Sequence, residues 1–253
     1  MMNTMMNTMM NTVKNLYIIR VFLNILQTSS LYYENTKERI IKYAPNIVKD
    51  EIIYFDFETT GLNPFHDKII EYCFMLSSDD NIQISDIVNP EQKIEKKITD
   101  ITGIHPDMFN GKTSIDSHIL NIYNFINGTY KNSIFSVEKK FLVAHNGLVF
   151  DKIFLERAVS KLKELNNNVT TSNFVYIDTL LLARKLLPNL KSHSLASLAK
   201  HYNVSSGTHR ASSDVLCLKT VYEKMIDELA NQNKISSCYY FKYPQKVVDF
   251  ISY

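Results

Sequence analysis

The sequence predicts an α/β domain in which helices pack on a mixed β-sheet. Three short apolar runs with short connections, at 52–57, 69–76 and 82–88, are typical of an antiparallel meander. Further along the chain, apolar runs at 141–145 and 174–177 alternate with helical patterns. The order βββ-α-β-α-β-α-α therefore predicts one mixed sheet flanked by helices.

Each expected element has a local reason in the sequence. Gly61 and Pro64 end the first strand, and the polar segment 77–81 predicts the turn between the second and third strands. The isoleucines of 115–126 recur at helical spacing, and Gly128 just beyond predicts the end of that helix. Apolar residues at helical spacing predict a further helix over 150–165. The remaining expected helices are the segments 178–187, 194–202 and 211–230.

The two ends of the chain are expected to lie outside the folded domain, which spans about residues 48–230. Residues 1–12 repeat MMNT three times, a low-complexity pattern. We interpret residues 1–47 as a leader with one candidate amphipathic helix, and mitochondrial targeting is the less favoured alternative. The tail 231–253 carries several aromatic residues, so we expect it to dock on the domain.

The composition excludes several classes of protein. Hydrophobic residues make up 45% and charged residues 21% of the 253 positions, which excludes a wholly disordered chain. A net charge of +2 argues neither for nor against nucleic acid. The three cysteines form no CxxC pair, which favours a reducing compartment over a disulfide framework or a structural zinc site. The chain has no 20-residue apolar stretch, so we expect no membrane contact and an intracellular location, cytoplasmic or nuclear.

Two acidic residues, Asp56 and Glu58, stand at the end of the first expected strand. Because side chains alternate along a strand, both carboxylates point to one face and Phe57 to the other. Two like charges side by side are costly unless a cation lies between them. The alternative is a solvated strand end, where acidic residues are common.

Three more candidates lie near the starts of later helices. Asp151 opens one helix, Asp214 lies about one turn into another, and His209 stands in the loop before it. Taken singly, Asp151 is explained by the helix dipole and His209 by a solvated loop. Taken together, four carboxylates offer the oxygen ligands that suit Mg²⁺ or Mn²⁺. Two such ions, about 3.5–4 Å apart, can clamp a phosphodiester, and a histidine can take the proton of the attacking water.

The same residues fall within motifs of a known family. These are DFETTGL at 56–62, continued by DKIIE at 67–71, then HNGLVFD at 145–151 and HRASSD at 209–214. In this order, over about residues 51–225, the chain resembles the DEDDh 3′–5′ exonucleases. The resemblance implies an RNase H-like fold, a five-stranded mixed sheet whose first three strands are antiparallel.

The resemblance also implies roles for individual residues. Four of them would bind two Mg²⁺ ions, with Mn²⁺ as a substitute: Asp56, Glu58, Asp151 and Asp214. His209 would be the general base. The implied substrate contacts are Thr59, Gly61 and Leu62 at the terminal nucleotide, Ile104 at a base, and Asn146 near the phosphate. We interpret Asp178 either as a carboxylate that supports the site or as a helix N-cap.

The function that follows is removal of nucleotides, one at a time, from a single-stranded or frayed 3′ end of DNA. The products would be 5′-mononucleotides, as in repair or proofreading. A 3′–5′ exoribonuclease that trims RNA is the alternative. A member that only binds nucleic acid is disfavoured, because such relatives usually lose a carboxylate or the histidine, and all five residues are present here. A polymerase and a second copy of the chain are the candidate protein partners.

Overall fold

The computed structural model describes residues 51–128, 139–166 and 169–252. Its five strands form one sheet in the order β3-β2-β1-β4-β5. The first three strands are antiparallel, β4 is parallel to β1, and β5 is parallel to β4. The predicted mixed five-stranded sheet is therefore confirmed. The strands are β1 (Glu51–Thr59), β2 (Ile69–Leu76), β3 (Asp79–Ile87), β4 (Lys140–Ala144) and β5 (Phe174–Asp178).

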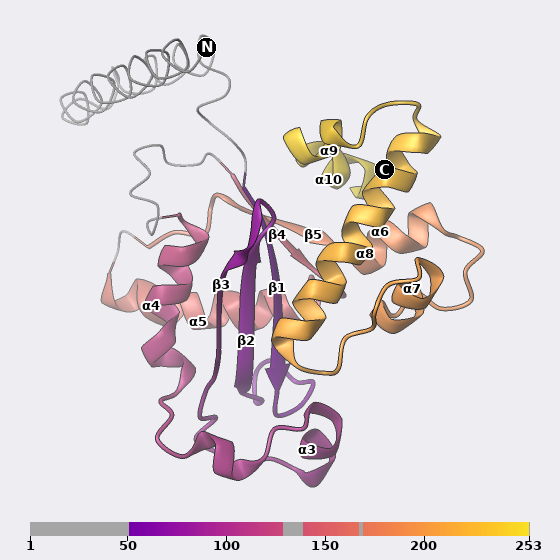
Figure 1. Cartoon of the computed structure of the whole chain (residues 1–253). Coiled ribbons are helices and arrows are strands. Elements are labelled where there is room, and N and C mark those ends of the chain that lie inside the picture. The colour runs from indigo at the N-terminus through magenta and orange to yellow at the C-terminus, as the bar shows by residue number, and fades with distance from the viewer. Residues whose placement is uncertain (1–50, 129–138, 167–168, 253) are drawn as a thin grey trace, which may run out of the picture. The chain divides into compact units, whose positions relative to one another are not determined.

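Helices cover both faces of this sheet (Figure 1). On one face lie α4 (Ile115–Ile126) and α5 (Asp151–Leu165). On the other face lie α6 (Thr179–Leu186), α7 (Leu195–His201) and α8 (Ala211–Gln232). All five agree with the predicted ranges to within two residues at each end.

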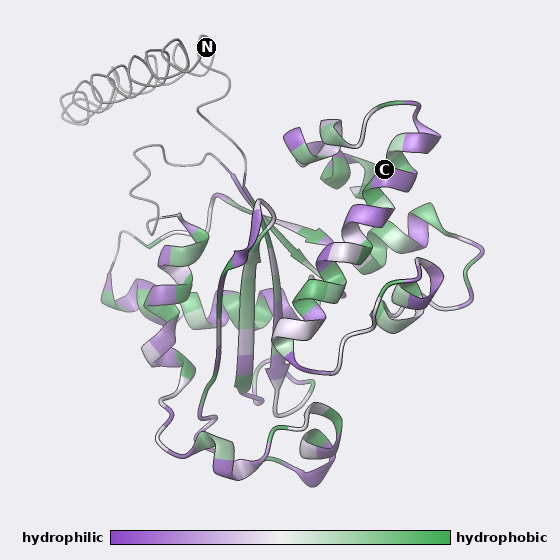
Figure 2. Ribbon diagram, viewed as in Figure 1, coloured by the Kyte–Doolittle hydropathy of each residue, from purple (hydrophilic) through white to green (hydrophobic). Residues whose placement is uncertain are grey.

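The sheet separates two hydrophobic clusters because side chains alternate along each strand. In β1, Ile52 and Tyr54 belong to the cluster that includes α8. Their neighbours Ile53, Phe55 and Phe57 belong to the cluster that includes α4 and α5. The hydropathy colouring agrees, since green is concentrated along the strands and the outer helix faces carry purple (Figure 2). Alternation along β1 thus decides which of its side chains face α8.

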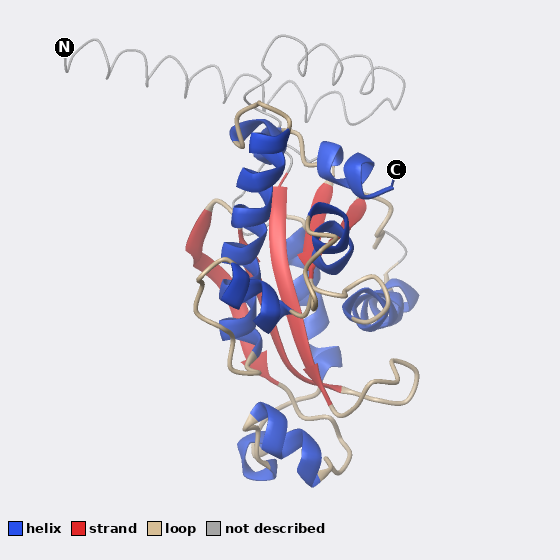
Figure 3. Ribbon diagram, turned by 90° about the vertical axis from the view of Figure 1, so that its right-hand side faces the viewer, coloured by secondary structure: helices blue, strands red, loops and turns tan. Residues whose placement is uncertain are grey.

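Two short elements beyond the end of the sheet were not predicted. They are α3 (Lys96–Thr102) and the 3₁₀ helix η1 (Pro106–Phe109), and both follow β3 in sequence. Figure 3 shows them as a separate group below the strands. The first has only two isoleucines in seven residues and no side-chain N-cap, so it is too short for a helical period to be recognised in its sequence. A small cluster of Ile70, Ile94 and Phe109 holds this segment in place.

The turn between β2 and β3 is shorter than the predicted 77–81. Only Ser77 and Ser78 form the turn, and residues 79–81 already belong to β3. That strand is the edge of the sheet and is largely exposed, so it tolerates polar residues. The prediction failed here because polar composition was taken as a turn signal.

Two short helices follow α8, namely α9 (Cys238–Lys242) and α10 (Gln245–Ser252). Tyr240 and Val247 are buried members of the cluster beside α8, and Lys185 of α6 lies 5.1 Å from the ring centre of Phe250. The compact unit therefore continues past residue 230. The leader 1–47 lies outside the described residues, and none of the helices in the described ranges is long and apolar enough to span a membrane.

Candidate active site

The site forms where β1 ends. Asp56 and Glu58 share the face of β1 that carries Ile52 and Tyr54, so both carboxylates lie on the α8 side. The register of β1 with β2 shifts between Glu58 and Thr59, a local irregularity of the kind often found next to active sites. As predicted, Phe57 packs in the opposite layer.

Asp151 reaches the same strand end from the other side of the sheet. It is the first residue of α5 and is buried. Pairing between β1 and β4 stops at Tyr54 and Val143, which leaves the end of β1 open on that edge. There the Asp151 Oδ1 accepts a hydrogen bond of 3.1 Å from the backbone N–H of Phe57. Asp151 is therefore fixed against the residue that lies between Asp56 and Glu58.

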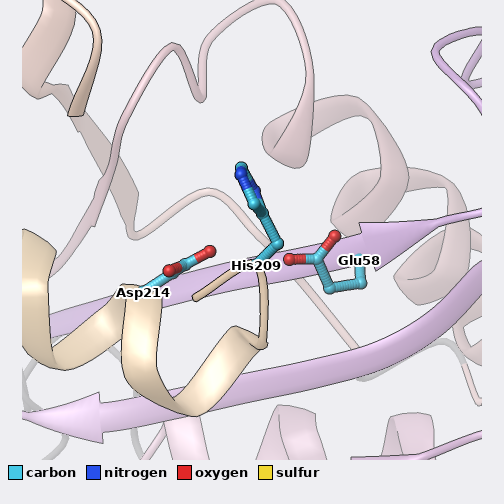
Figure 4. Close-up of side chains that lie close together, drawn as sticks. All are labelled: Glu58, His209 and Asp214. Carbon is cyan, nitrogen blue, oxygen red and sulfur yellow. The ribbon is translucent and has the colours of Figure 1, made fainter. Parts of the chain in front are cut away.

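Asp214 and His209 arrive from the beginning of α8. Asp214 lies in the first turn of that helix, and His209 is in the loop that precedes it. Glu58, His209 and Asp214 each offer one potential ligand atom, and these atoms lie within 4.8 Å of one another. Figure 4 shows the three side chains gathered between β1 and the start of α8. Glu58 and His209, which are 151 positions apart in the sequence, thus lie close together in the fold.

The crowding of carboxylates changes how readily they ionise. Burial, and then the charges of Asp214 and Glu71, raise the pKa of Asp56 to about 7. Burial, followed by the charge of Asp56, raises the pKa of Glu58 to about 8. Burial and the Asp56 charge also raise the pKa of Asp151 well above its usual value, and burial raises that of Asp214. The cluster is therefore short of positive charge.

This shortage and the donor chemistry fit divalent cations. Hard carboxylate oxygens are the ligands that Mg²⁺ and Mn²⁺ prefer. In the part of the chain that the structure describes, Glu58, His209 and Asp214 are the group of three candidate ligands that meets the distance requirement for one ion. Asp56 and Asp151 adjoin this group through the charge couplings above. The residues present are thus suited to hold cations.

These raised pKa values predict an unusual dependence of stability on pH. In chelator, the folded protein keeps protons on Asp56 and Glu58 that the unfolded chain loses from about pH 4 upwards. The free energy of unfolding should therefore fall as the pH rises from about 4 to about 8. Added Mg²⁺ should restore stability most strongly near pH 8, where it competes least with protons. Urea unfolding at pH 5 and pH 8, with chelator and with Mg²⁺, measures both effects, and a flat profile in chelator would contradict the prediction.

Asp178 holds the loop that carries the second motif. Its Oδ1 accepts hydrogen bonds from the N–H of Asn146 at 3.0 Å and of Leu180 at 2.9 Å, and its Oδ2 accepts one from the N–H of Leu148 at 3.1 Å. The sequence left two interpretations of Asp178 open, and the contacts agree with both. Asp178 is the N-cap of α6, and it also binds the backbone of the loop that precedes Asp151.

Replacing Asp178 should therefore destabilise the protein. Asp178→Ala leaves three backbone donors without their acceptor in a buried place, and we expect a loss of about 3 kcal/mol in the free energy of unfolding. Asp178→Asn keeps one acceptor oxygen and should lose less. A matched control is Asp116→Ala, which removes a surface pair with Lys161 and should stay within about 0.5 kcal/mol. Equal values for the two alanine variants, from urea unfolding, would refute this role.

Four of the five expected substrate contacts lie within five positions of Glu58 or Asp151 in the sequence, and one is an exception. Leu62 is 85% exposed, and Asn146 is exposed in the loop before α5. The Thr59 hydroxyl donates to the carbonyl of Gly61 at 2.7 Å, which shapes the turn after β1. A Cβ on Gly61 would lie 2.5 Å from an oxygen of Asp67, so a larger residue would displace this carboxylate, which accepts hydrogen bonds from the Thr60 hydroxyl and the Asn63 N–H.

The exception is Ile104. Its side chain is 0% exposed and packs with Ile70, Ile94 and Phe109. In this conformation it does not reach the surface, so contact between Ile104 and a base is not available. The prediction assigned an apolar residue to ligand binding where the fold uses it to anchor the segment that contains α3 and η1.

Two exposed apolar residues near the site were missed. Phe65 lies in the same loop as Leu62, and Val149 lies in the loop before α5. The guanidinium of Arg157 in α5 donates to the carbonyl of Pro64 at 2.6 Å, which ties the first loop to this helix. The sequence did offer a signal for Phe65. It directly follows Asn63 and Pro64, and an aromatic residue is unusual in such a solvated loop.

Comparison with known proteins shows the family to which the sequence is similar. The model of the RNase T exonuclease family, described as "Exonuclease", matches residues 53–222. The DNA polymerase III PolC-type protein of Clostridium perfringens is 36% identical over 188 residues, which cover 71% of this chain and 12% of the polymerase. The corresponding protein of Ureaplasma parvum is 32% identical over 201 residues, or 76% of this chain and 13% of that protein. The chain thus spans a small part of the length of these relatives.

Solved structures share the fold. The zinc-bound form of E. coli exonuclease I with single-stranded DNA has a TM-score of 0.58 at 17% identity, and the match covers 71% of this chain and 40% of that one. Exonuclease X in complex with 5′-overhanging duplex DNA has a TM-score of 0.52 at 21% identity, covering 79% of this chain and 99% of that one. From the family match over residues 53–222 and the acidic motifs within it, we conclude that this chain belongs to the RNase T family of DEDD-type exonucleases.

Proposed function

We propose that this chain is a metal-dependent exonuclease that removes nucleotides from the 3′ end of DNA and releases 5′-mononucleotides. The observation that carries the proposal is the meeting of Glu58, His209 and Asp214 at the end of β1, with Asp56 and Asp151 adjoining them. Structural ion-pair networks balance their charges internally, whereas this cluster has an excess of carboxylates. Such an arrangement is suited to cations and to a phosphodiester.

The proposed cation ligands are the four carboxylates, with Mg²⁺ as the first candidate and Mn²⁺ as the second. Two bound cations would make an attacking water more acidic and stabilise the oxygen that leaves the phosphorus. The chain itself sets the positions of the donors. Asp56 and Glu58 are fixed by the strand, Asp151 by its bond to the Phe57 N–H, and Asp214 by the first turn of α8.

The other proposed roles belong to residues around the carboxylate cluster, of which His209, Leu62 and Asn146 are exposed. His209 is exposed next to Glu58 and Asp214, where it can accept a proton from the attacking water. Leu62, also exposed, offers an apolar surface for the terminal base, and contact with a base face is tolerant of sequence. Thr59, Gly61 and Asn146 would contact the terminal sugar and phosphate. We therefore expect little dependence on the identity of the base removed.

DNA is the preferred substrate in this proposal for two reasons. The curated relatives are DNA polymerases, and the structural neighbours include complexes with single-stranded and overhanging DNA. RNA remains the alternative substrate, because both polymers carry the same phosphodiester. The relatives also make a polymerase the first candidate partner, ahead of a second copy of this chain.

The test uses oligonucleotides labelled at the 5′ end, with either a free 3′ hydroxyl or an inverted 3′-terminal nucleotide. We expect the free end to give a ladder shortened one nucleotide at a time, in the presence of Mg²⁺ or Mn²⁺ and not in chelator. The blocked oligonucleotide should survive. Cleavage of the blocked oligonucleotide would indicate an endonuclease and overturn the proposal. Matched RNA, and single- and double-stranded forms, then identify the preferred substrate.

A further inference from the structure

An ion pair between Glu71 and Arg210 lies beside the candidate active site, with the Glu71 carboxylate buried and the Arg210 side chain 37% exposed. Glu71 of β2 stands opposite Glu58 in the pairing of β1 with β2, and it is only 5% exposed. The Arg210 Nε donates to both Glu71 oxygens at 3.1 Å, and its Nη2 donates to Oε1 at 2.7 Å. The backbone N–H of Ala211 donates to Glu71 Oε2 at 2.8 Å. One carboxylate thus binds both the side chain of Arg210 and the first residue of α8.

This ion pair fixes the residue next to His209. Arg210 is the N-cap residue of α8, and His209 immediately precedes it. The backbone of His209 has a φ of 56°, in the left-handed region that a residue with a side chain rarely adopts. Such a conformation persists only where its surroundings hold it. On the other side of His209, the Thr208 N–H donates to the Ser213 Oγ at 2.9 Å. His209 is therefore held between two anchored neighbours.

We propose that Arg210 is a positioning residue, whose ion pair with Glu71 holds the loop so that the His209 ring lies beside Glu58 and Asp214. This inference rests on the proposed function, in which His209 accepts a proton. Arg210 is less suited to bind the substrate directly, because its Nε–H and one Nη2–H already donate to Glu71. The bidentate geometry also explains why lysine would be a poor substitute.

The test compares Arg210→Met in the natural chain and in a His209→Ala background. In the natural chain we expect kcat to fall about 10- to 100-fold, the scale of a misplaced catalytic group, with KM changed less than about twofold. Arg210→Lys should give a kcat between those of the natural chain and Arg210→Met, because lysine keeps the positive charge but cannot donate from two nitrogens to Glu71. In the His209→Ala background, measured at high enzyme concentration, the same replacement should cost less than about twofold, since nothing is left to position.

Several outcomes would overturn the proposal. An equal loss from Arg210→Met in both backgrounds would mean that Arg210 acts on the cations, the substrate or the fold, and not through His209. A rise in KM with unchanged kcat would indicate substrate binding. Glu71→Gln keeps an acceptor for the Ala211 N–H but also removes a charge that acts on Asp56. The part of its loss in kcat that disappears in the His209→Ala background therefore measures the positioning role.

Two controls separate this proposal from others. Lys161→Met breaks a surface ion pair between α5 and α4 and should leave kcat unchanged. Melting temperatures identify any variant that loses activity by unfolding, and the comparison then rests on Arg210→Lys and Glu71→Gln. If the natural chain hydrolyses no oligonucleotide, the proposed function fails. If it does and Arg210→Met has full kcat, only the positioning role fails.

Discussion

Asp56→Asn is expected to lower kcat about a thousandfold while leaving the fold intact. The asparagine fills the same volume but removes one negative charge from the proposed cation ligands. Loss of several kcal/mol of transition-state stabilisation, at about 1.4 kcal/mol for each tenfold, corresponds to this factor. In chelator the variant should be more stable than the natural chain near pH 8, because Asp214 and Glu71 no longer face a third buried charge.

Activity on a 5′-labelled oligonucleotide and the midpoint of urea unfolding measure these two effects. The matched control is Asp86→Asn, which removes a strand carboxylate that pairs with Lys112 on the surface. It should change neither quantity appreciably. Near-full activity of Asp56→Asn would remove Asp56 from the site. Activity lost together with stability in chelator would mean that Asp56 supports the fold and not the chemistry.

The carboxylates on β1 could be predicted because the reason is local. Alternation along a strand fixes Asp56 and Glu58 on one face and Phe57 on the other, whatever the rest of the fold does. The isoleucine spacing that predicted α4 is local in the same way. The position of Asp151 and Asp214 at the same strand end has no local cause in the sequence. We could predict it only from the order of the motifs in the family that the chain resembles.

What could not be predicted depends on contacts between distant segments. Glu71 and Arg210 are 139 residues apart, and nothing in the sequence around either residue predicts that the two form an ion pair. Ile104 is apolar in either role, so only the packing against Ile70 and Phe109 shows that it anchors a loop. The raised pKa of Asp56 likewise follows from burial and from Asp214, which only the folded chain brings near.

His209→Ala is the second large effect and separates two roles that the geometry allows. A general base contributes about 10²- to 10⁴-fold, so we expect kcat to fall within that range. Because one His209 nitrogen lies within 4.8 Å of candidate ligand atoms on Glu58 and Asp214, the imidazole could instead be a cation ligand. The two roles differ in how activity responds to the concentration of Mg²⁺.

If His209 accepts the proton, His209→Ala should keep the half-saturating Mg²⁺ concentration of the natural chain within about threefold, because all four carboxylate ligands remain. Asp214→Ala should raise that concentration strongly and also lower kcat. His201→Ala, at an exposed position of α7, is the matched control and should change neither value. Should His209→Ala raise the Mg²⁺ requirement as much as Asp214→Ala does, His209 would be a ligand. The proton acceptor would then have to be sought elsewhere, and the positioning role of Arg210 would have to be understood as support of the cation site.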